Sequence, residues 1–218
     1  GTEPYIVGGH TASGYWVDTH RAATLPGLFA AGDVAGGAPQ KYVSGAMAEG
    51  KIAAESAADF CRSHTLPELA ETKPDYEHFF ANPKPLFTAD ALEEAMQKFM
   101  DEYAGGRGTS YEYSAARLDI ARQHIEQLAE LAQQLHADSM DDLLRIYELT
   151  DRLEVCKAVI AHLAARHETR WPGFGIDQDY PNPNPAEESY VNSRLVNGRL
   201  EILRRPLVRE GDVYEHSH

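Results

Sequence analysis

The 218-residue sequence contains only two cysteines, at positions 61 and 156. They are far apart and lack Cys-x-x-Cys spacing, which favours two thiols in a reducing compartment over a disulfide. No apolar run approaches the roughly 20 residues that a membrane-spanning helix needs. The first residues carry neither the basic nor the apolar region of a signal peptide. We therefore expect a cytoplasmic protein.

Basic residues are also scarce, because 20 Lys and Arg face 34 Asp and Glu, for a net charge of −14. A nucleic-acid-binding surface needs clustered basic side chains, so this class of function is excluded. No Gly-x-Ser-x-Gly, P-loop or His-Glu-x-x-His motif is present. His162 and His167 lack a second pair of metal ligands at useful spacing, so we expect no metal site.

The first 62 residues are rich in glycine, alanine and small apolar residues. Gly27–Asp33 has the composition of a short buried strand, preceded by Pro26. Ser44–Cys61 is dominated by alanine and predicts a helix that can lie close to a sheet or a ligand. Four prolines in the following stretch predict a connector over residues 63–87.

Three amphipathic helices are predicted over residues 88–170. Thr88 caps the first and Ser139 the third, and Gly105-Gly106 ends the first. Each helix has one apolar stripe, so we expect the three to bury these stripes together as a bundle. Such a stripe is more typical of a core than of a cofactor site. Apolar residues at helical spacing include Leu92, Met96, Phe99, Leu118, Ala121, Ile125, Leu128, Leu143, Ile146, Leu153 and Ile160.

An extended tail is predicted over residues 171–218. Its prolines argue against a helix. The dipeptide Asn197-Gly198 between Tyr190–Val196 and Arg199–Leu203 predicts a β-hairpin, because both turn positions tolerate positive φ. The expected fold class is therefore α+β, with a bundle between a Gly- and Ala-rich segment and a hairpin tail.

The chemistry is concentrated in Leu25–Gly50, where a strand ends in Gly-Asp and a glycine-rich turn enters a helix. This order places Asp33 at the carboxyl edge of a sheet, where ligands of α/β folds bind. A carboxylate there can accept hydrogen bonds from ligand hydroxyls. The free N–H groups at the start of the helix can approach an anionic ring atom. Taken alone, Asp33 is equally well a turn or capping residue.

The same segment resembles the second flavin-contacting segment of flavoproteins with two dinucleotide-binding domains. The resemblance implies that residues 1–62 are the C-terminal part of an FAD-binding α/β domain, at its edge. It also implies contacts to noncovalent FAD. The cofactor-binding residues would be Gly32, Asp33, Ser44, Gly45, Ala46 and Met47.

A second stretch, Gly8–Asp18, resembles the segment that carries a substrate-binding histidine in fumarate reductases and succinate dehydrogenases. Its sequence, GGHTASGYWVD, is most similar to the corresponding segment of adenylylsulfate reductase flavoprotein subunits. The resemblance implies that His10 binds substrate and acts in catalysis, since histidine can hold or transfer a proton near neutral pH. Alone, His10 would rather be a surface residue. Trp16 would pack against the flavin or the adenine, or would be a buried tryptophan with a purely structural role.

The turn before the helix departs from the dicarboxylate enzymes. Those enzymes carry an arginine in this turn, whereas Pro39–Tyr42 supplies Lys41, a point charge without the planar fork of arginine. Lys41 therefore favours a sulfite- or phosphate-bearing substrate, or is a solvated turn residue. Glu168–Phe174 and Asp179–Pro181 resemble landmarks that close the helical domain in the adenylylsulfate reductase family.

The resemblance implies an FAD-dependent oxidoreductase that interconverts adenylylsulfate with AMP and sulfite, with electrons from a ferredoxin-like iron–sulfur subunit. No Gly-x-Gly-x-x-Gly for the ADP half of FAD is present. We therefore expect a C-terminal fragment that is inactive alone. The alternatives are a fumarate reductase or succinate dehydrogenase type of flavoprotein, and a non-enzymatic helical interaction fragment.

Overall fold

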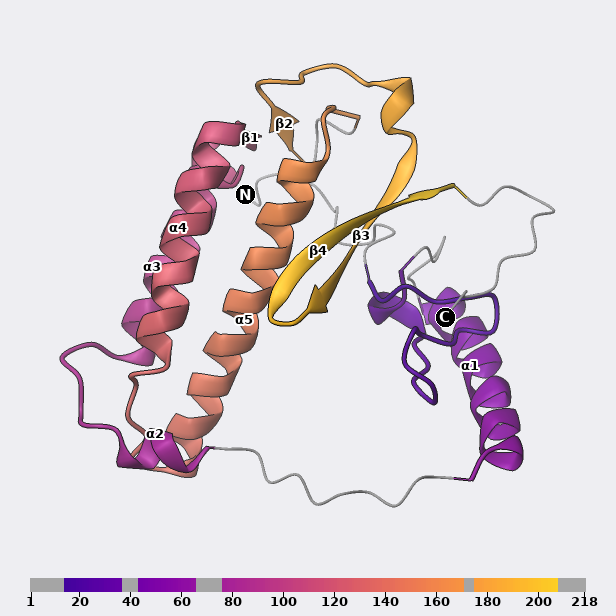
Figure 1. Cartoon of the computed structure of the whole chain (residues 1–218), viewed down its shortest axis with the longest axis horizontal. Helices are drawn as coiled ribbons and strands as arrows, with labels where there is room; N and C mark the ends of the chain where they lie inside the picture. The colour runs from indigo at the N-terminus through magenta and orange to yellow at the C-terminus, as the bar shows by residue number, and fades with distance from the viewer. Residues whose placement is uncertain (1–13, 37–42, 66–75, 171–174, 208–218) are drawn as a thin grey trace. The chain divides into compact units, whose positions relative to one another are not determined.

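The computed structural model describes residues 14–36, 43–65, 76–170 and 175–207. They form two compact units, one within residues 1–71 and one within residues 72–207 (Figure 1). Helices and short sheets are both present, which confirms the α+β class. Within the described ranges, no helix has the length and apolar character needed to cross a bilayer.

The first unit contains the predicted alanine-rich helix. This helix, α1, spans Val43–Ser63, slightly more than the sequence predicted. Its side toward the preceding loop carries Phe60, whose ring packs edge-on against Phe29 at a centroid distance of 6.1 Å. A small core of Val17, Ala30 and Ala35 lies in that loop.

The prediction of a regular strand over Gly27–Asp33 is wrong. Ala31 is extended (φ −143°, ψ 156°), but the next three residues form a 3₁₀ turn, η1, over Gly32–Val34. In the described part of this unit the bridges are isolated, and one joins Phe29 to Ala22. An extended segment becomes a strand only when a neighbour continues the hydrogen-bond ladder, and the described residues supply only single bridges.

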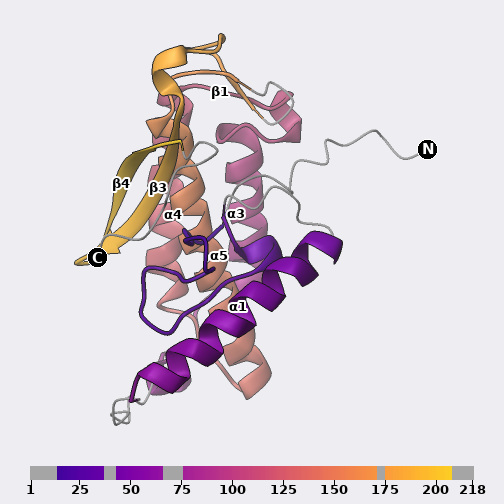
Figure 2. The ribbon, with the colours of Figure 1, turned by 90° about the vertical axis from the view of Figure 1, so that its right-hand side faces the viewer.

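The second unit contains the predicted three-helix bundle. The helices are α3 (Ala89–Tyr103), α4 (Ala115–Ala132) and α5 (Met140–Ala165). They lie side by side in Figures 1 and 2 and contact one another pairwise. The apolar stripes meet in one core, as predicted. Its buried members include Leu92, Met96, Leu118, Ala121, Ile125, Leu128, Leu143, Ile146, Leu149, Leu153 and Ile160.

The predicted caps of the first and third helices are confirmed. The Thr88 hydroxyl accepts the Ala91 N–H at 3.2 Å, and the Ser139 hydroxyl accepts the Asp142 N–H at 3.2 Å. Each bond satisfies an N–H that has no partner inside its helix. These caps fix where the bundle helices begin.

The sequence did not predict the short helix α2 or the short strands β1 and β2. Helix α2 (Glu77–Ala81) lies in the proline-rich connector, and its Phe79 is 3% exposed in the bundle core. Strands β1 (Glu112–Tyr113) and β2 (Ile176–Asp177) pair in parallel. A five-residue helix and two-residue strands are too short for periodicity to reveal, because tertiary contacts rather than local pattern stabilise them.

The hairpin is confirmed and is longer than predicted. Strands β3 (Ser189–Val196) and β4 (Arg199–Pro206) pair antiparallel around Asn197-Gly198, whose φ angles are +50° and +75°. Both strands contact α5 (Figure 2). The prolines before the hairpin exclude an α-helix but not a 3₁₀ turn, because η3 spans Pro185–Glu187.

Candidate functional site

The Gly-Asp turn singled out by the sequence lies directly on helix α1. Gly32 has φ +72°, and a Cβ added there would lie 3.3 Å from the Cβ of Ala46. The Gly32 N–H donates a buried hydrogen bond of 3.0 Å to the Glu49 carboxylate. Glycine is favoured because the turn needs a left-handed backbone and close approach to the helix. Asp33, in the same turn, is exposed.

The two stretches that carry the sequence resemblance meet in this unit. The Tyr15 N–H donates to the Val34 carbonyl at 2.7 Å, and the Gly36 N–H donates to the Tyr15 carbonyl at 2.7 Å. Tyr15 and Ala35 thereby form a parallel bridge. The end of the histidine-bearing stretch therefore runs along the segment that follows Asp33.

Gly14 makes this close approach possible. A Cβ at Gly14 would lie 2.6 Å from the Val34 oxygen and 2.7 Å from the Gly36 nitrogen, and its φ is +149°. A backbone atom cannot move aside as a flexible side chain can. Only glycine fits here without displacing the chain after Asp33.

The start of α1 presents small side chains beside the turn. Ser44 is exposed and Gly45 is partly buried. Ala46 contacts Gly32, whereas Met47 is 72% exposed. The first N–H groups of a helix have no intrahelical partner and carry partial positive charge, which suits a ligand atom that becomes anionic. Small side chains leave that helix end approachable.

Of the three remaining predicted site residues, one lies within the described residues and two lie outside them. Trp16 is described and partly buried next to Tyr15. His10 and Lys41 lie outside the described residues. The predicted cavity shared by His10 and Asp33 therefore stays a prediction, although the Tyr15–Ala35 bridge brings the two stretches together.

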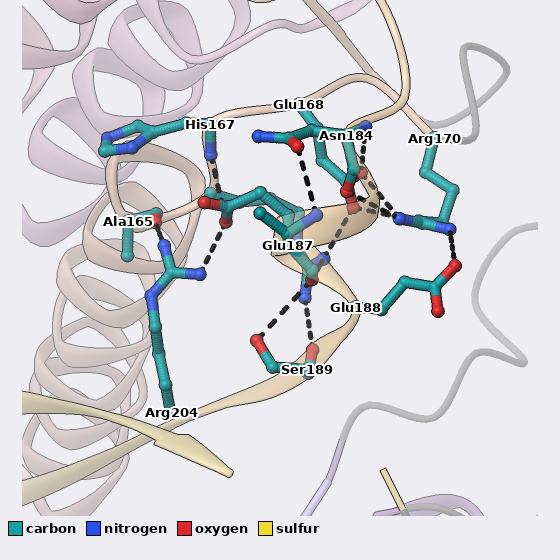
Figure 3. Close-up of polar contacts among 11 residues, drawn as sticks. Ala165, His167, Glu168, Arg170, Asn184, Glu187, Glu188, Ser189 and Arg204 are labelled. Atoms are coloured by element: carbon teal, nitrogen blue, oxygen red, sulfur yellow. Dashed lines mark hydrogen bonds and ion pairs between the residues drawn. The ribbon is translucent and has the colours of Figure 1, made fainter. Parts of the chain in front are cut away.

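A second polar cluster lies in the other unit, where the end of α5 meets the start of β3 (Figure 3). Glu168 is fully buried and receives hydrogen bonds from Arg166, Arg170 and the Asn184 N–H, each at 2.8 or 2.9 Å. Hydrogen bonding to Arg170, more than offsetting burial, lowers the pKa of Glu168 to about 2. A carboxylate so fully engaged with protein groups is structural rather than catalytic.

Glu187 completes this cluster. Its carboxylate pairs with Arg204 and accepts the His167 N–H at 3.4 Å. Arg204 also donates to the Ala165 carbonyl at the end of α5. The Glu168 landmark recognised in the sequence thus joins the bundle to the hairpin.

Within the described ranges, no group of three or more His, Cys, Asp and Glu side chains is arranged so that it could hold a metal ion. His162 bonds Ser193 of the hairpin instead, at 2.9 Å. The His167 ring lies 4.9 Å from that of Tyr180. Both histidines therefore have structural contacts.

No protein-family model matches the chain. It is 28% identical over 249 residues to the adenylylsulfate reductase subunit alpha of Megalodesulfovibrio gigas, covering 94% of the chain and 37% of that protein. The adenylylsulfate reductase structure from Archaeoglobus fulgidus matches 91% of the chain at 30% identity with a TM-score of 0.76. Over more than nine tenths of its length, this chain is therefore similar to the adenylylsulfate reductase alpha subunit.

The fold is shared more widely. The Escherichia coli quinol fumarate reductase FrdA, in a structure that carries a mutation, matches 94% of the chain with a TM-score of 0.75, at only 15% identity. The chain spans about a third of the length of these proteins, 34% for the Archaeoglobus fulgidus adenylylsulfate reductase and 38% for FrdA. The predicted resemblance to adenylylsulfate reductase and the fumarate reductase fold is confirmed.

Proposed function

We propose that this chain is part of an FAD-dependent oxidoreductase that converts adenylylsulfate to AMP and sulfite, or the reverse. The observation that carries the proposal is the Tyr15–Ala35 bridge. It pairs Tyr15, in the stretch predicted over Gly8–Asp18, with Ala35 in the segment that follows Asp33, and Gly32 packs against Ala46 of α1. These are the parts that the sequence assigned to substrate and to flavin.

The described residues fit the cofactor. Asp33 is an exposed carboxylate that can accept hydrogen bonds from ribityl hydroxyls, and Gly32 adds no side chain beside it. Ser44, Gly45 and Ala46 leave the N-terminus of α1 approachable, so that its partial positive charge favours an anionic ring edge. Bound FAD would supply two-electron transfer. Met47, being largely exposed, would lie at the border of the site.

The substrate side of the proposal rests on residues with complementary chemistry. His10 would bind substrate and exchange a proton, and Lys41 would attract the anionic sulfate or phosphate group. Trp16, partly buried beside the bridge, would wall the flavin or the adenine. Residues 1–62 would then be the C-terminal segment of the FAD-binding domain, residues 63–87 a connector, residues 88–170 the bundle and residues 171–218 the tail.

The parent enzyme would receive its electrons from a ferredoxin-like iron–sulfur subunit. The net charge of −14 suits docking to a partner with a basic surface. Cys61 and Cys156 are free thiols, in keeping with the cytoplasmic location that we propose.

The test uses the full-length gene product, purified and loaded with FAD. We expect adenylylsulfate-dependent oxidation of a reduced viologen dye, with AMP and sulfite as products, and no oxidation with fumarate. Asp33→Ala should weaken FAD binding at least tenfold. Asp59→Ala, which removes an exposed carboxylate of α1, is the matched control and should bind FAD normally.

Two results would contradict the proposal. Fumarate turnover without adenylylsulfate turnover would favour the fumarate reductase type of flavoprotein. Absence of FAD binding by the full-length protein would favour a helical interaction fragment without enzymatic function.

A further inference from the structure

Helix α1 contains one buried carboxylate, Glu49, whose side chain is 7% exposed. A buried ionised carboxylate is costly unless hydrogen bonds and an opposite charge stabilise it. Glu49 has both. Its Oε2 accepts the Gly32 N–H at 3.0 Å, and its Oε1 lies 3.8 Å from Nη2 of Arg21.

The first of these contacts holds the turn that carries Asp33. Ala46 and Glu49 are three residues apart and lie on the same face of α1. Ala46 touches Gly32 and Glu49 binds its N–H, so both act on the residue before Asp33. Together these two contacts fix the position and the orientation of the η1 turn relative to the N-terminal part of α1.

The second contact holds the chain that leads into the turn. Arg21 stands in a left-handed conformation (φ +64°) at the end of a tight turn. Its own carbonyl accepts the Ala30 N–H at 3.0 Å, two residues before Gly32. Its guanidinium therefore ties the chain next to Ala30 to the same carboxylate that holds Gly32.

We propose that Glu49 is the positioning residue of the candidate flavin site. Its carboxylate clamps Gly32 and Arg21, and so fixes Asp33 relative to the N-terminus of α1, where the proposed function places FAD. This inference rests on that proposed function. Glu49 lies beneath the turn and acts through Gly32.

The test compares three variants. Glu49→Gln keeps an oxygen acceptor for Gly32 and removes the charge that faces Arg21. Glu49→Leu removes both. Glu55→Gln is the control, because Glu55 lies on the same helix, is 68% exposed and pairs with Lys51 at a similar 3.8 Å.

Two quantities are measured on each variant. Amide hydrogen exchange of Gly32, followed by NMR on the 218-residue chain without flavin, reports the clamp. The Kd for FAD, measured on the full-length gene product, reports the positioning. We expect Glu49→Leu to accelerate Gly32 exchange at least tenfold and to weaken FAD binding at least tenfold. Glu49→Gln should lie between Glu49→Leu and wild type in both measurements, and Glu55→Gln should match wild type.

The outcomes separate the clamp from the proposed function. Unchanged Gly32 exchange in Glu49→Leu would overturn the clamp, and faster exchange with unchanged FAD affinity would overturn positioning. If Glu49→Leu does not fold, Glu49→Gln decides, since behaviour identical to wild type in both measurements would overturn the inference. A wild-type protein that binds no FAD would overturn the proposed function and positioning together, while the exchange measurement still decides the clamp.

Discussion

Arg170 and Glu168 meet through two parallel hydrogen bonds, Nε to Oε1 at 2.9 Å and Nη2 to Oε2 at 2.8 Å. This two-point geometry is the strongest that a guanidinium and a carboxylate form. Because Arg166 and the Asn184 N–H engage the same carboxylate, Glu168 connects the residues after α5 to the segment before β3. Glu168 therefore acts with the Glu187–Arg204 pair and the His162–Ser193 contact in holding the hairpin on the bundle.

Glu168→Gln should destabilise the second unit by about 2 kcal/mol, because the half-buried Arg166 and Arg170 lose the fully buried charged carboxylate that both of them bind. The pKa of Glu168 is lowered to about 2 from 4.5. Its stabilisation is therefore present above pH 4.5 and is lost as pH falls toward 2.

Urea unfolding at several pH values between 2 and 7 measures both effects. Wild type should lose stability below pH 4.5 and the variant should lose less. Glu201→Gln, which removes a 46%-exposed carboxylate paired with Arg194, should change stability by less than about 0.5 kcal/mol. Equal effects of the two variants would refute the role of Glu168.

Gly14→Ala should disrupt the alignment of Tyr15 with Ala35, since its Cβ would meet backbone atoms at 2.6 Å. A cost of about 2 kcal/mol or more is expected for such strain. Hydrogen exchange of the Gly36 amide, which donates to Tyr15, should accelerate. Gly50→Ala is the control: nothing lies within 4 Å of its Cβ, and alanine should stabilise α1 by up to about 1 kcal/mol. Unchanged Gly36 exchange in Gly14→Ala would disprove the close approach.

Leu153→Ala should cost about 3 kcal/mol of unfolding free energy, because Leu153 is 0% exposed and its removal leaves a cavity among α5 and its neighbours. Leu144 lies on the same helix and is 59% exposed. Leu144→Ala should therefore change stability by less than about 0.5 kcal/mol. Chemical denaturation of both variants gives the comparison, and a loss of similar size in each would argue against the assigned helix face.

The parts of the fold that sequence predicts are those with a local physical cause. Thr88 and Ser139 cap helices through contacts three residues away, and Asn197-Gly198 adopts the positive φ angles that this turn requires. The parts that it missed depend on distant residues. Helix α2 is held in place because Phe79 packs into the core formed by the later helices of the bundle. Strand β1 pairs with a segment more than sixty residues away.

The candidate site shows the same division. The motif identified Gly32, and the structure shows the reason, since a left-handed turn sits on Ala46. The sequence did not single out Glu49, because a glutamate in an alanine-rich helix is usually an exposed, solvated side chain. Its burial becomes visible only when Gly32 and Arg21 are placed against it. Recognising it from sequence would have required knowing which face of α1 is covered.

His162 provides a test of how the hairpin is held on α5. Its Nε2 lies 2.9 Å from the Ser193 hydroxyl of β3. Burial, with a smaller effect of Arg166, lowers the pKa of His162 from 6.5. Because the folded state binds this proton less readily than the unfolded state, stability is full above pH 6.5 and declines as pH falls below that value. His162→Gln removes the titrating group while retaining a polar side chain, so urea unfolding between pH 5 and 8 should show a smaller decline in the variant. An identical decline in both proteins would show that the pH dependence arises elsewhere.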